Sequence, residues 1–183
     1  MQNKVKQLRV KTGEVSSVMY NEEKFKIDWR TIVVHDDNNI KGFFGPARFL
    51  SNFPDAICEF EGMIFRSSEL AYQAAKVAPA KRYLFLPVTS AKSKTLWKQI
   101  GTVYSPAEWD LIKESVMQRV VFSKFEMNKD LRAQLIETGD KYLEEKNFWR
   151  DNFWGVDYKI GGQNKLGSIL MATRAYWKNY EKY

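Results

Sequence analysis

Residues 105–125, "SPAEWDLIKESVMQRVVFSKF", predict one long helix around which the rest of the chain has to pack. Ser105 and Glu108 have the spacing of a capping box, and Pro106 stands at the first helical position, where a missing N–H costs little. Apolar side chains recur at helical spacing, at Trp109, Ile112, Val116, Val120 and Phe125. Because such a helix buries its apolar face, the sequence predicts a largely helical core.

Shorter elements are predicted on both sides of this helix. Residues 67–76, 90–101, 128–139 and 164–177 each begin with a serine or an asparagine that can cap a helix, and the second and third of them end in glycine. Residues 56–65, "AICEFEGMIF", contain two short β-type runs split by a Glu-Gly pair, which predicts a hairpin.

The predicted fold class is α+β, mainly α. Residues 41–183 are expected to form a single domain of packed helices with a short β-hairpin or small sheet near its N-terminal part. Residues 1–40 alternate short apolar pieces with charged ones and are interpreted as an N-terminal extension with one or two strands. The apolar fraction of 44% and the aromatic fraction of 15% favour a packed globule over a disordered chain.

The charge of the chain favours a polyanionic partner. The net charge is +7 and the isoelectric point is near 9.3, which suits nucleic acid or a small molecule that carries phosphate. The basic residues are spread along the sequence without a long Lys/Arg block. Charge alone therefore leaves both kinds of partner open.

The counts of histidine and cysteine exclude several kinds of site. His35 and Cys58 are the only residues of their types, so multi-histidine and cysteine-rich zinc sites are ruled out, and neither a metal nor a cofactor is expected. Cys58 is interpreted as a core residue, because nothing local supports a nucleophile pair with His35. The chain lacks a secretory apolar stretch and the ~20 apolar residues that cross a bilayer, which predicts a cytoplasmic protein without a membrane partner.

The segment "GPARFLSNF" at residues 45–53 is a first candidate for ligand binding. Phe49 and Phe53 could stack on a flat ring, while Arg48 and Asn52 offer hydrogen-bond donors. A turn that its aromatic residues fix in the core explains the same pattern.

A second candidate is the polar stripe of Glu69, Gln73 and Lys76. Offsets of four and seven residues bring these side chains to one helix face. Glu, Gln and Lys are also common on exposed helix faces, so the stripe is either a solvated surface or the polar wall of a cleft.

A third candidate is the loop "DNFWGVDY", in which Asp151 and Asp157 flank Trp154. Two carboxylates beside a large aromatic ring could stabilise a sugar cation and orient water, as the hydrolysis of a sugar bond requires. A surface loop anchored by its tryptophan is the alternative.

The fourth candidate is "IGGQNKLG" at residues 160–167. Paired glycines before a helix start expose backbone N–H groups, which attract phosphate. The stretch matches neither the Walker pattern nor a dinucleotide fingerprint, so a glycine-rich turn with an asparagine cap is the alternative.

Taken in order, these pieces resemble the NADAR family, the YbiA-like N-glycosidases. The matching landmarks are "FFGPARFLSNF", "EGMIFRSSELAYQAAK", "VMQRVVFSKFEMNKDLRAQLIETGDKYLEE", "DNFWG" and "GGQNKLGSILMATR", within residues 41–175. The resemblance implies a YbiA-like fold and cleavage of N-glycosidic bonds. The implied substrates are phosphoribosylated riboflavin-pathway intermediates or ADP-ribose attached to guanine bases in nucleic acid.

The resemblance also implies roles for particular residues. Glu69 corresponds to the essential Ser-Glu motif of the family, with Gln73 and Lys76 on the same helix face. The other motif positions are Asn52 and Phe53, Trp154 and Gly155, and Asn164 with Leu166 and Gly167. Some relatives carry an acidic residue directly after Trp-Gly, whereas Val156 stands there in this chain. Asp151 and Asp157 therefore both remain candidates for a second catalytic carboxylate.

On this basis we expect a cleft in which Glu69 stabilises the sugar cation and Lys76 acts as a cation or as an amine nucleophile. The expected substrate contacts are Phe49, Phe53 or Trp154 stacked on a base, and Arg48, Lys92 and Lys165 at phosphates. The expected substrate is ADP-ribosylated DNA, as in reversal of a DNA ADP-ribosyltransferase toxin. A riboflavin-pathway intermediate and a non-catalytic binding module are the alternatives, and the sequence leaves the oligomeric state open.

Overall fold

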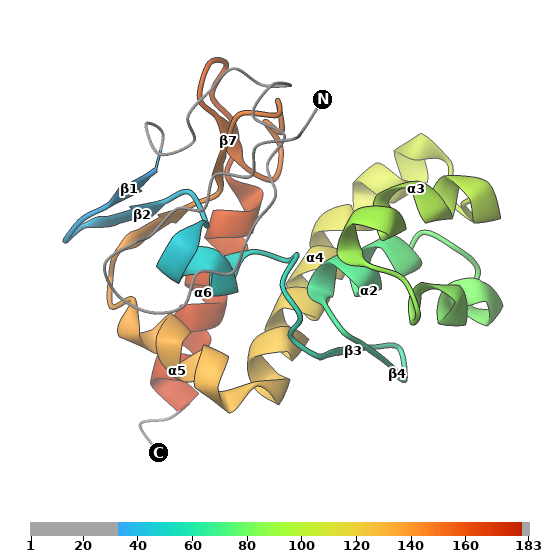
Figure 1. Cartoon of the computed structure of the whole chain (residues 1–183), viewed down its shortest axis with the longest axis horizontal. Coiled ribbons are helices and arrows are strands. Elements are labelled where there is room, and N and C mark those ends of the chain that lie inside the picture. The colour runs from blue at the N-terminus through green and yellow to red at the C-terminus, as the bar shows by residue number, and fades with distance from the viewer. Residues whose placement is uncertain (1–32, 181–183) are drawn as a thin grey trace, which may run out of the picture.

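A computed structural model describes residues 33–180, and its central element is the long helix α4 (Pro106–Met127) (Figure 1). The other bounds are β1 Val34–His35, β2 Asn39–Lys41, the 3-10 helix η2 Gly45–Leu50, β3 Cys58–Phe60, β4 Met63–Phe65, α2 Ser68–Ala74, the 3-10 helix η3 Pro79–Phe85, α3 Ser90–Ile100, α5 Lys129–Glu137, β5 Tyr142–Glu144, β6 Lys146–Asn147, β7 Val156–Asp157 and α6 Lys165–Tyr180. On one side of α4 lie α2, α3, β3 and β4, and on the other lie α5 and α6 (Figure 1). Because α4 contacts elements of both groups, it joins them into one core.

Three small sheets complete the fold. In the largest, β1 is antiparallel to β2, and β2 is parallel to β5, with Ile40 opposite Leu143. β6 and β7 form a parallel pair, and β3 and β4 form the hairpin. The predicted domain boundary after residue 40 falls inside β2, and residues 1–32 of the predicted extension lie outside the described part of the chain.

The predicted fold class is confirmed, since the chain is mainly helical with small sheets. The capping box of Ser105 and Glu108 is present at the start of α4, and Val120, Val121 and Phe125 of that helix are fully buried. The hairpin is also as predicted. Its two turn residues, at positions 61 and 62, have φ values of 49° and 81°, as the two central residues of a type I′ turn require.

Three predicted helix caps are wrong. The hydroxyl of Thr89 caps α3, and that of Ser90 donates instead to the carbonyl of Phe53 (2.9 Å). The side chain of Asn128 does not cap α5, because its amide donates hydrogen bonds to the carbonyls of Ile57 (2.7 Å) and Lys124 (2.6 Å). The side chain of Asn164 does not cap α6, because its amide donates to the carbonyl of Leu143 on β5 (2.9 Å) and accepts the N–H of Glu145 (3.0 Å). Both amides hold together segments that are far apart in the sequence, which local spacing does not reveal.

Lys124 anchors the segment that follows η2. Its ammonium group is buried in the core and donates to the backbone carbonyls of Phe49 (2.5 Å) and Ser51 (2.8 Å). Burial lowers the pKa of Lys124 to about 7. The contact fixes the chain just before Asn52, and the carbonyl of Asn52 accepts the N–H of Glu69 at the start of α2 (3.0 Å).

Close packing of α6 on β5 requires a glycine at position 167. A Cβ atom there would overlap the carbonyl oxygen of Leu143 and would come within 2.5 Å of both polar atoms of the Asn164 amide. The backbone of α6 therefore lies directly against β5.

We expect Gly167→Ala to destabilise the fold by about 1–3 kcal/mol, because the added methyl group pushes α6 away from β5. Chemical denaturation of the variant and of Ser168→Ala, a change at the neighbouring exposed position, measures the difference. Equal midpoints for the two variants would show that the helix moves away without cost.

Candidate active site

Helix α2 is buried along its whole length. The hydroxyl of Ser67 accepts the N–H of Leu70 (3.2 Å) and begins the helix, and every residue from Ser68 to Ala74 is buried. Glu69 and Gln73 are each only 6% exposed. The polar stripe predicted from the sequence is therefore an interior feature and not a solvated surface.

The three polar side chains of the stripe are joined by hydrogen bonds. Gln73 Nε2 donates to Glu69 Oε1 (2.8 Å), and Lys76 Nζ donates to Gln73 Oε1 (2.8 Å). A carboxylate accepts and an ammonium donates, so the two bonds together fix the orientation of the Gln73 amide. Glu69 and Lys76 are thus linked through an amide and not by a direct contact.

Lys76 lies just after α2 in a cage of aromatic rings. Its Nζ is 5.1 Å from the ring centre of Tyr72, 4.7 Å from that of Trp97 and 5.4 Å from that of Trp109. Burial lowers the pKa of Lys76 to about 8, although the charge of Glu69 opposes the shift. About a tenth of this amine is therefore neutral at pH 7, far more than for an ordinary lysine.

The carboxyl group of Glu69 is shifted in the opposite direction. Burial raises its pKa above the usual value, and the negative charge of Asp151 adds to the shift. The positive charges of Lys94 and Lys76 and the hydrogen bond from Gln73 counteract it. These effects show that Asp151 and Lys94 lie within electrostatic range of Glu69.

On α3 it is Lys94, and not the predicted Lys92, that interacts with this group. Lys94 Nζ lies 4.5 Å from the ring centre of Phe53, and its charge lowers the pKa of Glu69. Lys92 is exposed in the first turn of α3, where its N–H is capped by Thr89 (3.3 Å). Residue type alone did not distinguish the two lysines, because both lie in the same short stretch of α3.

Glu145 is a further member of the cluster that the sequence analysis missed. It lies between β5 and β6, and its Oε2 atom is buried without a hydrogen-bond partner among residues 33–180. Burial raises the pKa of Glu145 to about 8, and the charges of Asp151 and Glu69 act in the same direction. Arg48 and Lys94 oppose the shift. In the sequence Glu145 is the second of two adjacent glutamates, a pattern that is indistinguishable from surface charge.

Two of the predicted motif elements hold the backbone of Glu145. Its N–H donates to Asn164 Oδ1 (3.0 Å), and its carbonyl accepts the N–H of Val156 (2.9 Å). A Cβ atom on Gly155 would overlap that same carbonyl oxygen. The structure therefore places Gly155 and Asn164 around the strand that carries Glu145.

The first two N–H groups of α6 bond to carbonyl groups of the preceding loop. The N–H of Leu166 donates to the carbonyl of Trp154 (3.0 Å), and that of Lys165 donates to Phe153 (3.2 Å). Lys165 Nζ pairs with Glu114 of α4 (3.1 Å). These groups therefore already have partners within the protein, and phosphate binding by this stretch stays a prediction.

The two candidate aspartates have different surroundings. Asp151 Oδ1 accepts the N–H of Trp154 (2.9 Å), and its charge raises the pKa of Glu69. Burial would raise the pKa of Asp157, but its carboxylate accepts three backbone N–H groups, from Lys159, Arg150 and Ile160, which hold the pKa below its usual value. Asp151 thus interacts electrostatically with Glu69, whereas the carboxylate of Asp157 stabilises the backbone of the loop around it.

The remaining predicted residues border the same region. Asn52 Oδ1 accepts the hydroxyl of Ser68 (2.9 Å), so its side chain supports the start of α2. The Trp154 ring meets Tyr72 edge-to-face at 5.5 Å. Phe49 packs against the core, and the half-buried Arg48 acts electrostatically on Glu145.

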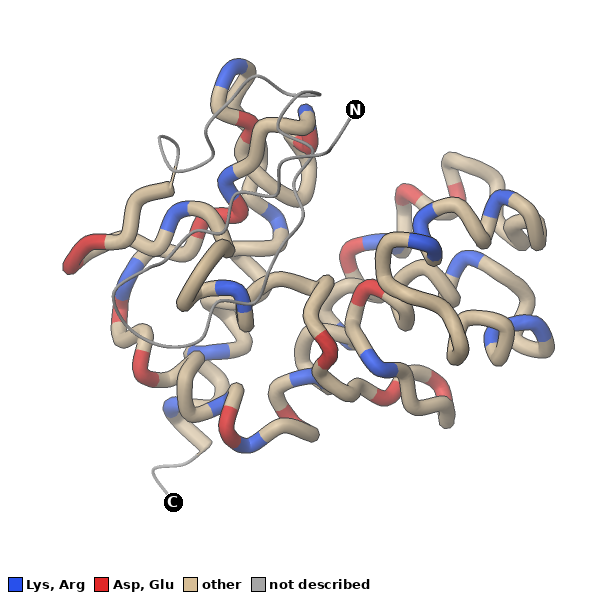
Figure 2. Tube along the Cα trace, viewed as in Figure 1, with Lys and Arg blue, Asp and Glu red and all other residues tan. Residues whose placement is uncertain are grey.

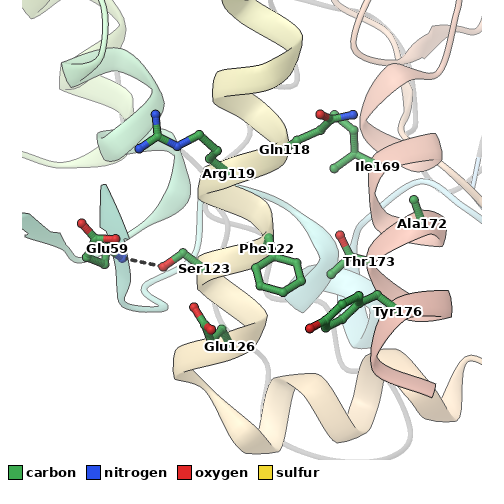
Figure 3. A pocket seen from close by; sticks show the side chains of 10 residues that line it. All are labelled: Glu59, Gln118, Arg119, Phe122, Ser123, Glu126, Ile169, Ala172, Thr173 and Tyr176. Atoms are coloured by element: carbon green, nitrogen blue, oxygen red, sulfur yellow. Dashed lines mark hydrogen bonds between the residues drawn. The ribbon is translucent and has the colours of Figure 1, made fainter. Parts of the chain in front are cut away.

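A separate hollow lies on another face of α4. It measures about 460 Å³ and is formed by α4, α6 and β3, with Phe122 and Tyr176 in its wall (Figure 3). None of the charged residues around Glu69 lines it. Within residues 33–180, no group of three His, Cys, Asp or Glu side chains could hold a metal ion, and no helix is long and apolar enough to cross a membrane.

A model of the NADAR domain matches residues 34–177. The chain belongs to the NADAR family. This NADAR protein is 30% identical to an N-glycosidase of Nostoc punctiforme over 138 residues, which cover 73% of this chain and 88% of the relative. It is 33% identical over 138 residues to a riboflavin biosynthesis protein of Vibrio vulnificus, covering 74% of this chain but 37% of that protein.

The NMR structure of Escherichia coli YbiA has the same fold as this NADAR protein. The TM-score is 0.67 at 27% identity, with 83% of this chain and 92% of that chain covered. In sequence, the N-glycosidase YbiA of E. coli is 31% identical over 134 residues, which cover 68% of this chain and 78% of the relative. The resemblance found in the sequence and the YbiA-like fold are both confirmed.

The raised pKa of Glu145 predicts a pH-dependent effect on stability. The part of the free energy of unfolding that comes from this shift is fully present below pH 4.5, the ordinary pKa of a glutamate. It is lost as the pH rises through about 8, the pKa of Glu145 in the folded protein. Glu145→Gln cannot ionise, so the variant should gain stability relative to the wild type across this range, on the order of 3 kcal/mol.

Urea denaturation at several pH values between 5 and 9 measures this difference. Glu137→Gln, a change of an exposed glutamate on α5, supplies the reference slope. A constant difference between wild type and Glu145→Gln at all pH values would contradict the shift.

Proposed function

We propose that this NADAR protein is an N-glycosidase that hydrolyses the C1′–N bond of an ADP-ribosyl or phosphoribosyl adduct. The observation that carries the proposal is the buried Glu69, linked through Gln73 to Lys76. A buried carboxyl group linked through an amide to an amine that lies among three aromatic rings is costly for the fold unless it has a chemical use. The names of the relatives from Nostoc punctiforme and E. coli support the same activity.

The arrangement suits cleavage of a C1′–N bond. As this bond breaks, its electron pair moves to the base and positive charge develops on the sugar. The carboxylate of Glu69 stabilises that charge and accepts a proton from the water whose oxygen bonds to C1′. The base leaves with a proton on its nitrogen, so the reaction balances without an oxidant or a reductant.

We further propose that the substrate is ADP-ribose attached to guanine in DNA, which would make the protein a reversal enzyme for a DNA ADP-ribosyltransferase toxin. A net charge of +7 supports a polyanionic substrate. Lys and Arg occur on both sides of α4, including α3 beside the candidate site (Figure 2). A basic chain gains affinity for DNA by releasing counterions, whereas a small metabolite uses only the charges nearest to it.

A second candidate substrate is a phosphoribosylamino-pyrimidine of riboflavin biosynthesis. The name of the Vibrio vulnificus relative favours it, although this chain spans only 37% of that protein. A non-catalytic ADP-ribose or nucleic-acid binding module is the third interpretation. An anionic ligand gains nothing from a carboxylate in its pocket, so the presence of Glu69 argues against a pure binder.

Glu69→Gln should lower the release of ADP-ribose from guanine-ADP-ribosylated DNA by about 10³-fold, because the neutral amide cannot stabilise the sugar cation. Mass spectrometry of the released sugar measures this loss, with Glu137→Gln as an exposed control. The phosphoribosylamino-pyrimidine is tested in parallel. Cleavage of the pyrimidine alone would assign the metabolite reaction, and an inactive wild type that binds both ligands would favour the binding module.

Lys76 has two candidate roles in this reaction: a cation that binds phosphate or pairs with Glu69, and an amine nucleophile that replaces water in the attack on C1′. Its pKa near 8 supplies some neutral amine. In the nucleophilic role the amine bonds to C1′ as the C1′–N bond to the base breaks and gives up one proton to Glu69; the C1′–O4′ bond then opens, the amine nitrogen passes a second proton to the ring oxygen to leave an imine, and water later hydrolyses that imine. Sodium borohydride added during turnover should therefore attach the sugar covalently to Lys76, as peptide mass spectrometry can detect. Full activity of Lys76→Arg without an adduct would instead leave Lys76 the role of a binding cation.

A further inference from the structure

Glu145 has a buried carboxyl oxygen that neither the fold nor the proposed reaction uses. Its Oε2 atom has no hydrogen-bond partner among the described residues. The neighbouring Glu144 also has a buried oxygen, but that oxygen faces Lys146 at 3.7 Å. An unpaired buried carboxyl oxygen is costly, and it needs a partner that residues 33–180 do not supply.

The backbone around Glu145 is held more firmly than a surface loop requires. Asn164 fixes its N–H, Val156 fixes its carbonyl, and Gly155 allows the two segments to approach closely. The constraints act on the backbone, whereas Oε2 remains unpaired. This combination positions a side chain accurately and leaves its proton available.

Glu145 and Glu69 interact electrostatically, but the hydrogen bonds and charges around their two carboxyl groups differ. The charge of Glu69 raises the pKa of Glu145, and the charge of Asp151 raises the pKa of both groups. Glu69 accepts a hydrogen bond from Gln73 and is close to Lys76, and both favour its ionised form. Glu145 lacks such a bond at Oε2, so it is the better proton carrier of the two. Burial raises the pKa of both carboxyl groups, but only Glu69 has the Gln73 hydrogen bond and the Lys76 charge that counteract the shift, and such a difference in surroundings suits a pair for base and acid roles.

We propose that Glu145 is the general acid that protonates the leaving base. The inference rests on the proposed N-glycosidase function. As the C1′–N bond breaks, its electron pair stays on the nitrogen of the base, and the proton of Glu145 moves to the departing base. Water or the Lys76 amine bonds to C1′, Glu69 accepts the proton that this step releases, and Glu145 regains a proton from solvent. No other reactant is required.

Leaving-group dependence tests this role. Guanine needs a proton to depart, whereas its N7-methylated form already carries a positive charge and departs as a neutral base. Glu145→Gln should reduce cleavage of the ordinary guanine adduct by about 10²–10⁴-fold, and N7-methylation of the same adduct should restore most of the loss. Glu69→Gln should impair both adducts. If the wild type cleaves only the pyrimidine adduct, the same comparison is made with N-alkylated pyrimidine.

The pH profile provides a second readout that a structural role would not change. An acid that must be protonated gives a fall in kcat at high pH, and an amine that must be neutral gives a fall at low pH. Glu145→Gln should remove the fall at high pH and keep the fall at low pH, and Glu145→Asp should retain both limbs. Glu144→Gln serves as the matched control, with an unchanged profile expected.

The outcomes separate the two levels of the proposal. An active wild type with equal losses for Glu145→Gln on both leaving groups, or with an unchanged limb at high pH, overturns the role of Glu145 alone. A wild type that cleaves neither kind of adduct overturns the N-glycosidase function itself. Thermal unfolding of each variant shows whether a loss reflects misfolding, and Glu145→Asp provides a folded carboxylic acid at the same position if Glu145→Gln unfolds.

Discussion

The site depends on the burial of α2. A helix with a Glu, a Gln and a Lys at positions 69, 73 and 76 would normally turn these residues to water, but here the surrounding elements enclose it. Removing a carboxyl group and an amine from water shifts both of their pKa values toward neutrality. The Gln73 amide keeps the two groups bridged, so that they remain electrostatically coupled without forming an ion pair. The aromatic rings around Lys76 add cation–π attraction that offsets part of the desolvation cost.

The segment that carries Glu145 depends on close contacts between backbones. Glycines at positions 155 and 167 allow β5, the loop after it and the start of α6 to approach within distances that a Cβ atom would prevent. The Asn164 amide then bonds to β5 and to Glu145. Gly155 and Asn164, which the sequence predicts to be ligand contacts, thus also have a structural role. They hold the backbone of Glu145 in position.

The sequence predicted the elements well, because their signals are local. The capping box of α4, the type I′ turn of the hairpin and the polar stripe on α2 all involve residues within seven positions of one another. It did not reveal the long-range contacts. The amide groups of Asn128 and Asn164 bond to residues 71 and 21 positions away, respectively, which overturned their predicted capping roles. Glu145 and Lys94 were missed for the same reason, since their importance comes from charges on other elements.

The parallel pairing of β2 with β5 has a consequence for how the protein is made. The pairing joins residues 39–41 to residues 142–144. During synthesis β2 therefore has no β5 to pair with until about a hundred further residues have been added to the chain. Contacts between such distant segments form late, because a long loop has to close first. Glu145 directly follows that second strand. Helix α2, which carries Glu69, can therefore assemble early. The pairing of β2 with β5, next to Glu145, is completed only near the end of synthesis. Glu69 and Glu145 therefore come together in the last stage of folding.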